Sequence, residues 1–259
     1  LTNIQQYDSA SGEPVGPPVS CGADAPALAY SPDGAFLALA DSSQVRFLNR
    51  VDSGQTASVD VGARIADLAF SPSGTFLAVA VGAEVRFLAY PTGEEVFEAI
   101  AHSRPIAHLA LDAGGVLLAT VTRDNAARAW DIATGVALGP EIRHAARVDD
   151  IAFAPKRLAV ATAATDSRVR FWDTETGRPH GSPISVPGVV QEIAFTSDGS
   201  TMFTGGRSGR VLRWRLPFLP ATVGEMERRT RATTGLRAGS GQSILRVTPV
   251  EWAALQAEM

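Results

Sequence analysis

Short runs in which apolar residues alternate with polar or small ones fill most of this chain. Val148–Phe153 alternates in this way, and Leu158–Thr162 follows after a turn that contains Pro. Val169–Trp172 alternates again, and a weaker segment surrounds Pro183–Val186. Alternation with a period of two is typical of β strands that bury one face. The pattern therefore predicts a unit of four short strands joined by tight turns.

The same unit recurs along the chain at a nearly constant interval. Six segments end in a similar phrase, such as Val45-Arg46-Phe47-Leu48, and their last residues are Tyr7, Leu48, Leu88, Trp130, Trp172 and Trp214. The intervals are 41, 40, 42, 42 and 42 residues. A fixed period of this size indicates one supersecondary unit stacked on copies of itself. Because four strands of this length cannot bury both faces alone, we expect them to stack radially as propeller blades.

Turn-forming residues lie between the predicted first and second strands. The segments are Ser31-Pro32-Asp33-Gly34, Ser71-Pro72-Ser73-Gly74, Asp112-Ala113-Gly114-Gly115 and Thr196-Ser197-Asp198-Gly199. Pro presets φ at the first turn position, and Gly adopts the left-handed conformation that a Cβ disfavours. The sequence thus supports both the strands and the hairpins that join them.

Two repeats share a further motif that resembles the WD40 repeat. An Asp follows Trp130 and Trp172 directly, and Thr, Asp and His residues precede each Trp at matching spacings. The two sets are His102, Thr120, Asp124 and Trp130, and His144, Thr162, Asp166 and Trp172. The resemblance covers about residues 1–216. It implies an all-β, WD40-type β-propeller, with a buried His–Asp–Thr–Trp hydrogen-bond network in these two repeats.

The other repeats depart from the family pattern. Ser42, Gly82 and Ser208 stand at the Asp position, and no His precedes them at the family's spacing. We expect five complete four-stranded blades from residues 14–216, with residues 1–8 left from a sixth. The outer strand of each blade should come from the segment before its first inner strand. The chain reads as a fragment, and a complete ring would hold more blades, with seven as our expectation.

The resemblance also implies a partner-binding face. In WD40 proteins, contacts often come from the residue before the turn Asp and from residues that flank the first apolar position of the first strand. The corresponding residues are Asp41, Arg64, Arg123, Arg147, Asp149, Thr165, Gln191 and Arg207. Four of the eight are Arg, whose guanidinium group matches carboxylate and phosphate oxygens. A protein or peptide partner, specifically an acidic or phosphorylated one, is therefore expected. The alternative is that these Arg residues reflect composition and are only solvated.

Residues 217–259 lack the repeat and are predicted to form a separate appendage. Glu225–Leu236 is typical of a helix, Ser243–Val247 of a strand, and a last helix opens with Thr248 as its N-cap and Pro249 at its first position. This tail resembles the segment that follows the propeller in bacterial WD40-repeat serine/threonine protein kinases. We expect a helix-strand-helix unit that docks on the propeller or on itself.

Composition narrows the possible partners and surroundings. The net charge is −4, so no global basic field attracts nucleic acid or an acidic membrane surface. No apolar run reaches 18 residues, so no membrane contact is expected from this chain. Cys21 is the single cysteine and cannot form an intrachain disulfide, which fits a cytoplasmic location.

The sequence favours a binding module over an enzyme. It has only four His residues and no Gly-x-Ser-x-Gly motif, so a nucleophilic triad finds little support. No Cys or His cluster has zinc spacing, and the glycines at Gly205–Gly209 lack the Lys of a P-loop, so no metal or other cofactor is expected. The rival function is a propeller hydrolase or lyase, which a cluster of carboxylates and His at the central channel would favour. The motif positions predict no such cluster. A sensor propeller of a signal-transduction ATPase is a third possibility.

Overall fold

The computed structural model describes residues 2–8, 11–21, 27–49, 54–155, 159–206 and 209–216, together with two short strands further on. Every regular element in these ranges is a β strand. Among the described residues no helix is long and apolar enough to cross a membrane.

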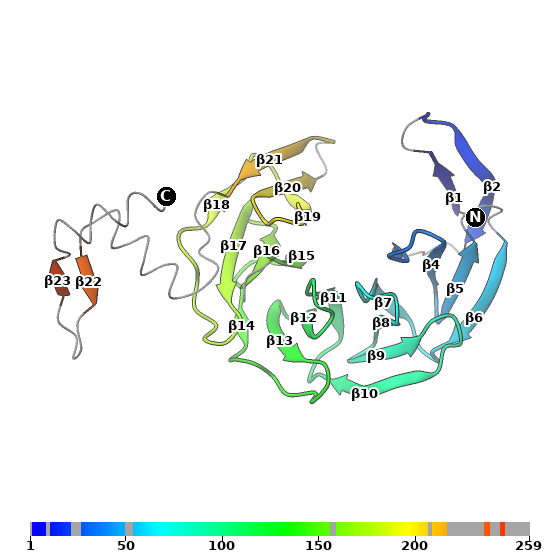
Figure 1. Cartoon of the computed structure of the whole chain (residues 1–259), viewed down its shortest axis with the longest axis horizontal. Coiled ribbons are helices and arrows are strands. Elements are labelled where there is room, and N and C mark those ends of the chain that lie inside the picture. Colours follow the sequence, from blue (N-terminus) through cyan, green and yellow to red (C-terminus); the bar gives the residue numbers. More distant parts are fainter. Residues whose placement is uncertain are drawn as a thin grey trace.

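Four successive antiparallel sheets each contain four strands (Figure 1). The first consists of β3 (Leu28–Tyr30), β4 (Phe36–Asp41), β5 (Gln44–Asn49) and β6 (Gln55–Asp60). The second consists of β7 (Ile65–Phe70), β8 (Phe76–Val81), β9 (Glu84–Ala89) and β10 (Glu95–Ala101). The third consists of β11 (Ile106–Leu111), β12 (Leu117–Thr122), β13 (Ala126–Asp131) and β14 (Ile142–Arg143). The fourth consists of β15 (Val148–Phe153), β16 (Ala159–Ala164), β17 (Arg168–Asp173) and β18 (Ile184–Ser185).

The two ends of this series are incomplete within the described residues. A two-stranded sheet of β1 (Thr2–Tyr7) and β2 (Pro14–Cys21) precedes the four, and a three-stranded sheet of β19 (Val190–Phe195), β20 (Thr201–Gly206) and β21 (Val211–Arg215) follows them. The expectation of five complete blades from residues 14–216 is therefore not met in the described part of the chain.

The expected origin of the outer strands was also wrong. β2 pairs with β1, and β6 pairs with β5, so each outer strand follows its partner in the chain. The same holds for β10, β14 and β18. The reason is local: each outer strand is joined to its partner by a connection of at most ten residues, whereas pairing with a later strand requires a longer loop to close.

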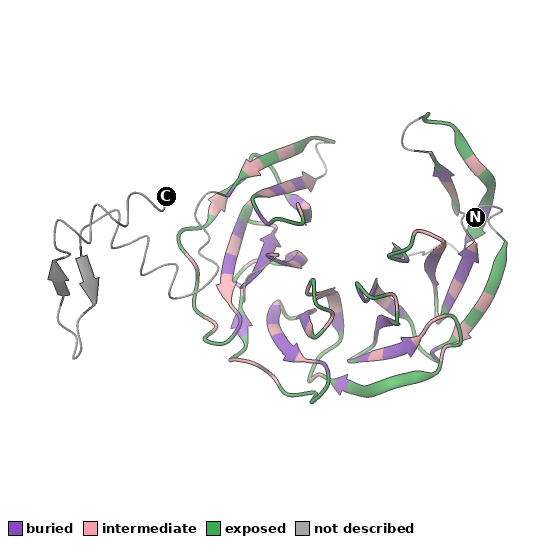
Figure 2. Ribbon diagram, in the orientation of Figure 1, coloured by how far each residue is buried: buried purple, intermediate pink, exposed green. Residues whose placement is uncertain are grey.

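The sheets form an arc in which the first strands lie toward the middle (Figure 1). β7 contacts β3 and β11, and β15 contacts β11 and β19. Each hydrophobic core cluster takes its side chains from two neighbouring sheets; Phe47 of β5, for example, packs in one cluster with Ile65 and Val79 of the next sheet. Burial is concentrated in the inner strands, while outer strands such as β6 and β10 are largely exposed (Figure 2). Apolar contact between successive sheets is thus the main source of stability in the arc.

The predicted turns between first and second strands are confirmed. The amide of Gly34 donates to the carbonyl of Ser31 at 2.8 Å, and the amide of Gly115 donates to the carbonyl of Asp112 at 3.0 Å. Both glycines have φ near +68°, where a Cβ would be strained. These hairpins fix the register of the inner strands.

The tail is described only at β22 (Leu236–Ala238) and β23 (Ile244–Arg246), which form an antiparallel pair. β23 lies within the strand predicted at residues 243–247. β22 was not predicted, because Leu236 was assigned to the end of a helix. Both predicted helices lie outside the described residues, apart from Leu236.

Candidate functional site

A buried Thr hydroxyl joins a His and a Trp in the third four-stranded sheet. Nε2 of His102 lies 2.8 Å from Oγ1 of Thr120, and Nε1 of Trp130 donates to the same oxygen at 3.0 Å. The next sheet repeats the arrangement with His144, Thr162 and Trp172, at 2.9 Å for both bonds. The structure therefore brings together three members of each predicted set.

The geometry assigns the protons in this network. Because Thr120 accepts a hydrogen bond from the Trp130 indole, its own hydroxyl hydrogen is free to donate to Nε2 of His102. Nδ1 of His102 then carries the ring proton and donates to the carbonyl of Ile100 at 3.1 Å. Burial lowers the pKa of both His102 and His144, which keeps each ring in the neutral form that this network requires.

The two Asp residues of the predicted networks bond elsewhere. Asp124 accepts a hydrogen bond from the Thr122 hydroxyl at 2.6 Å and lies 3.7 Å from the Arg143 guanidinium. Asp166 accepts a hydrogen bond from Arg170 at 3.2 Å. These contacts hold the pKa of both carboxyl groups below the ordinary value, with the bonds from Thr122 and Arg170 as the largest causes. Each Asp lies in a tight turn, and a side chain from a strand that borders the turn donates to its carboxylate. The His is therefore not its hydrogen-bond partner.

The sequence missed one further copy of the Thr–Trp bond. Nε1 of Trp214 donates to Oγ1 of Thr204 at 2.9 Å, although buried Val186 stands where the other two repeats have His. The ten-residue spacing from Thr to Trp, which all three repeats share, was the sequence feature that could have predicted this hydrogen bond. In the first sheet Ala38 and Leu48 hold the same two positions and are fully buried. Replacing both polar partners together leaves no unpaired buried group.

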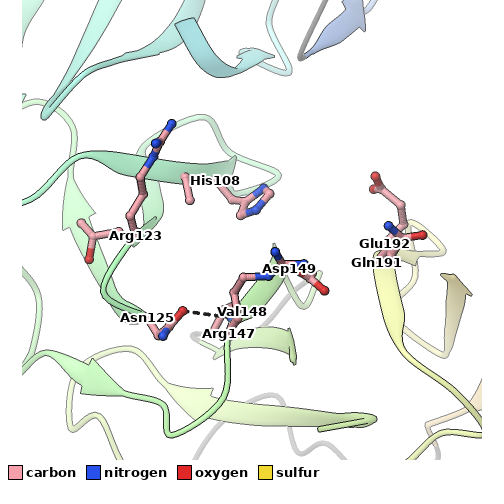
Figure 3. A pocket seen from close by; sticks show the side chains of 10 residues that line it. His108, Arg123, Asn125, Arg147, Val148, Asp149, Gln191 and Glu192 are labelled. Carbon is pink, nitrogen blue, oxygen red and sulfur yellow. Dashed lines mark hydrogen bonds and ion pairs between the residues drawn. The ribbon is translucent and has the colours of Figure 1, made fainter. Parts of the chain in front are cut away.

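A cavity of about 530 Å³ opens among the third, fourth and fifth repeats (Figure 3). Its wall comes from β11, the turn between β12 and β13, the start of β15, and β19. The lining residues are Ala107, His108, Thr122, Arg123, Asn125, Arg147, Val148, Asp149, Gln191 and Glu192.

The eight residues predicted to face a partner divide into three groups. Arg123, Arg147, Asp149 and Gln191 line the cavity. Thr165 lies beside it, because its amide donates to the carbonyl of Arg147 at 2.8 Å. The others are not part of the lining: Asp41 forms an ion pair with Arg46 at 3.5 Å, Arg64 is exposed just before β7, and Arg207 lies outside the described residues.

Charges of both signs meet in the cavity. Nη2 of Arg147 lies 2.7 Å from Oδ1 of Asp149. In the described part of the chain, no acidic side chain pairs with the exposed guanidinium of Arg123. Glu192 faces the cavity from β19, where its side chain stays largely exposed and partial loss of water contact raises the pKa of its carboxyl group. Two guanidinium groups therefore face two carboxyl groups in this cavity. The surface that was expected to be basic carries equal numbers of basic and acidic side chains here.

A line of titratable residues follows the inner strands, which the sequence interpretation did not foresee. Asp67, His108, Asp150 and Glu192 occupy equivalent positions on β7, β11, β15 and β19. Their spacings are 41, 42 and 42 residues, so the repeat period was the available signal. None of the four is one of the motif positions considered from sequence, and they come from the first strands of four neighbouring sheets.

Two of these residues connect neighbouring sheets. Asp67 accepts hydrogen bonds from the amides of Leu68 at 2.8 Å and Leu109 at 2.9 Å. Asp150 accepts from Ile151 at 2.8 Å and from Ile193 at 2.6 Å. Leu109 and Ile193 belong to the following sheet, so each carboxyl group links two inner strands.

Burial raises the pKa of these linking carboxyl groups. The pKa of Asp67 rises to about 6 and that of Asp150 to about 8, while the backbone hydrogen bonds act in the opposite direction. Burial also lowers the pKa of His108, whose Nδ1 lies 4.0 Å from Oδ2 of Asp67. Within the described residues no three His, Cys, Asp or Glu side chains are placed to share a metal ion.

Comparison with known families agrees with this repeat geometry. The family described as WD domain, G-beta repeat matches residues 141–173. The match runs through β14, β15, β16 and β17, which are the outer strand of one sheet and the first three strands of the next. One sequence repeat therefore spans two sheets. No curated protein matches the chain.

Proposed function

We propose that this chain is a non-enzymatic protein-interaction module, built as part of a WD40-type β-propeller over residues 1–216, with residues 217–259 as an appendage. The matched WD repeat and the series of four-stranded sheets support this architecture. The observation that carries the proposal is the cavity. It gathers four of the eight residues chosen from sequence as partner contacts, and they come from three different repeats.

The proposed partner is a protein or peptide segment that presents an acidic or phosphorylated side chain. Arg123 is the group that supports this choice, because it is exposed at the cavity wall and no described acidic side chain neutralises it. A guanidinium group binds a carboxylate or phosphate through two parallel hydrogen bonds. The module would serve as the recognition or regulatory part of a larger cytoplasmic bacterial signalling protein. A serine/threonine kinase fits the tail sequence, and a signal-transduction ATPase is the alternative.

The test is binding of an acidic and phosphorylated peptide library to the full chain and to Arg123→Ala. We expect the variant to lose at least ten-fold in affinity, corresponding to about 1.4 kcal/mol, in a salt-sensitive manner. Arg178→Ala removes an exposed guanidinium outside the cavity and serves as the matched control. Equal binding by all three proteins would contradict docking at this cavity. Thermal unfolding of each protein separates loss of binding from loss of fold.

A second candidate function has one observation in its favour. Asp67, His108, Asp150 and Glu192 form the kind of central cluster expected in a propeller hydrolase or lyase. Against it, each oxygen of Asp67 and Asp150 already accepts a backbone hydrogen bond. A substrate screen that found turnover in the wild type and none in His108→Gln, with both proteins folded, would favour the enzyme.

A further inference from the structure

The cavity carries opposite charges on opposite sides. Arg123 projects from the turn between β12 and β13, and Glu192 stands on β19 across the opening, with His108 and Asp149 between them (Figure 3). A ligand with a single negative charge would gain from Arg123 but would also approach two carboxyl groups. The arrangement is therefore better matched by a ligand with both signs of charge.

The carboxyl group of Asp149 has an unused acceptor. Its side chain is only 10% exposed, and its Oδ1 pairs with Nη2 of Arg147 at 2.7 Å. Its Oδ2 is buried and has no hydrogen-bond partner. An unsatisfied buried acceptor is costly, so a hydrogen-bond donor supplied by a ligand would be favourable here.

Arg147 pairs with the other oxygen of this carboxyl group. Its side chain is 64% exposed although it pairs with a mostly buried carboxylate. An anionic group on the ligand would draw this exposed guanidinium away from Asp149, since a bidentate contact with phosphate or carboxylate replaces the single ion pair. A cation on the same ligand could then take the place of Arg147 at Asp149. The exchange leaves no buried charge unpaired.

We propose that the cavity binds a peptide segment in which an acidic or phosphorylated residue is directly followed by Lys or Arg. The anion pairs with Arg123 and Arg147, and the cation pairs with Asp149 and Glu192. The cavity volume of about 530 Å³ lies within the usual range for ligand sites, roughly 300–1,000 Å³. This inference rests on the proposed peptide-binding function and specifies which peptide is selected.

The test uses four fluorescent peptides of one glycine-rich sequence and the full chain. They carry phosphoserine followed by lysine, phosphoserine followed by leucine, serine followed by lysine, and serine followed by leucine. We expect the first to bind at least about ten-fold more tightly than the second or third, as one charge-assisted contact is lost in each. In Asp149→Asn most of the advantage of the first peptide over the second should be lost, because only Glu192 remains to pair with the lysine. The second peptide should bind as well as before or better, because Arg147 is released.

Glu192→Gln is the second variant, since its exposed side chain can change without disturbing the core. It should reduce the advantage of the adjacent lysine in the same direction. Glu175→Gln, which removes an exposed charge outside the cavity, should leave all four affinities unchanged. Equal binding of the first two peptides to the wild type would overturn this inference and leave the proposed acidic-peptide function intact. Failure of both phosphopeptides to bind would count against the proposed function itself.

Discussion

Replacing Thr162 with Val is the sharpest test of the His–Thr–Trp network. Thr162 is fully buried, and its hydroxyl oxygen contacts His144 and Trp172 at 2.9 Å each. Val has almost the same shape, so the substitution opens no large cavity. What it removes is the hydroxyl group, which leaves the Trp172 N–H without an acceptor and Nε2 of His144 without a donor.

The magnitude follows from these two orphaned groups. Each buried polar group left unsatisfied costs about 1–3 kcal/mol, so the free energy of unfolding should fall by about 2–6 kcal/mol. For a chain of this size each kcal/mol lowers the melting temperature by roughly 2–4 °C, which gives a decrease of about 4–24 °C. Urea and thermal unfolding followed by tryptophan fluorescence measure both quantities.

Two further variants make the result interpretable. Thr162→Ser keeps the hydroxyl group and should retain most of the stability. Asp166→Ala removes the ion pair with Arg170, which is partly exposed, and should cost no more than about 1 kcal/mol. The reasoning is refuted if Thr162→Val unfolds like the wild type, or if Asp166→Ala costs as much as Thr162→Val.

Two other predictions concern a close contact and a buried carboxyl group. Gly206→Ala should destabilise the chain by about 1–3 kcal/mol, because a Cβ there would lie 2.0 Å from the carbonyl oxygen of Val189. Gly205→Ala is the control in the same denaturation series, because a Cβ at that position has no atom within 4 Å. Asp150 has its pKa raised from 3.8 to about 8, so its contribution to stability is fully present below pH 4 and is lost as the pH rises through 8. Relative to Asp150→Asn, the free energy of unfolding of the wild type should therefore fall by up to roughly 1.4 kcal/mol per pH unit between these two pH values. Parallel pH profiles of melting temperature for the two proteins would contradict the assignment.

Much of the local structure follows from the order of residues alone. Alternation at Val169–Trp172 predicts an inner strand, and the structure has β17 at Arg168–Asp173. Gly34 and Gly115 predict tight turns because their conformation needs a residue without a Cβ. The Thr–Trp spacing of ten residues places both side chains on one face of a hairpin as diagonal neighbours, because Thr162 pairs with Arg170 and Trp172 pairs with Val160. These are short-range features, so the sequence determines them directly.

Only the tertiary structure decided which distant residues share an environment. Asp166 matched the motif, yet a nearer donor on β17 satisfies it, because competition among hydrogen-bond partners depends on distances that sequence spacing does not contain. Asp67 and Asp150 were unremarkable in sequence, and their raised pKa values arise because neighbouring sheets remove them from water. The cavity likewise combines Arg123, Asp149 and residues of a third repeat, and its charge balance arises because three repeats contribute to one wall, which no single repeat specifies.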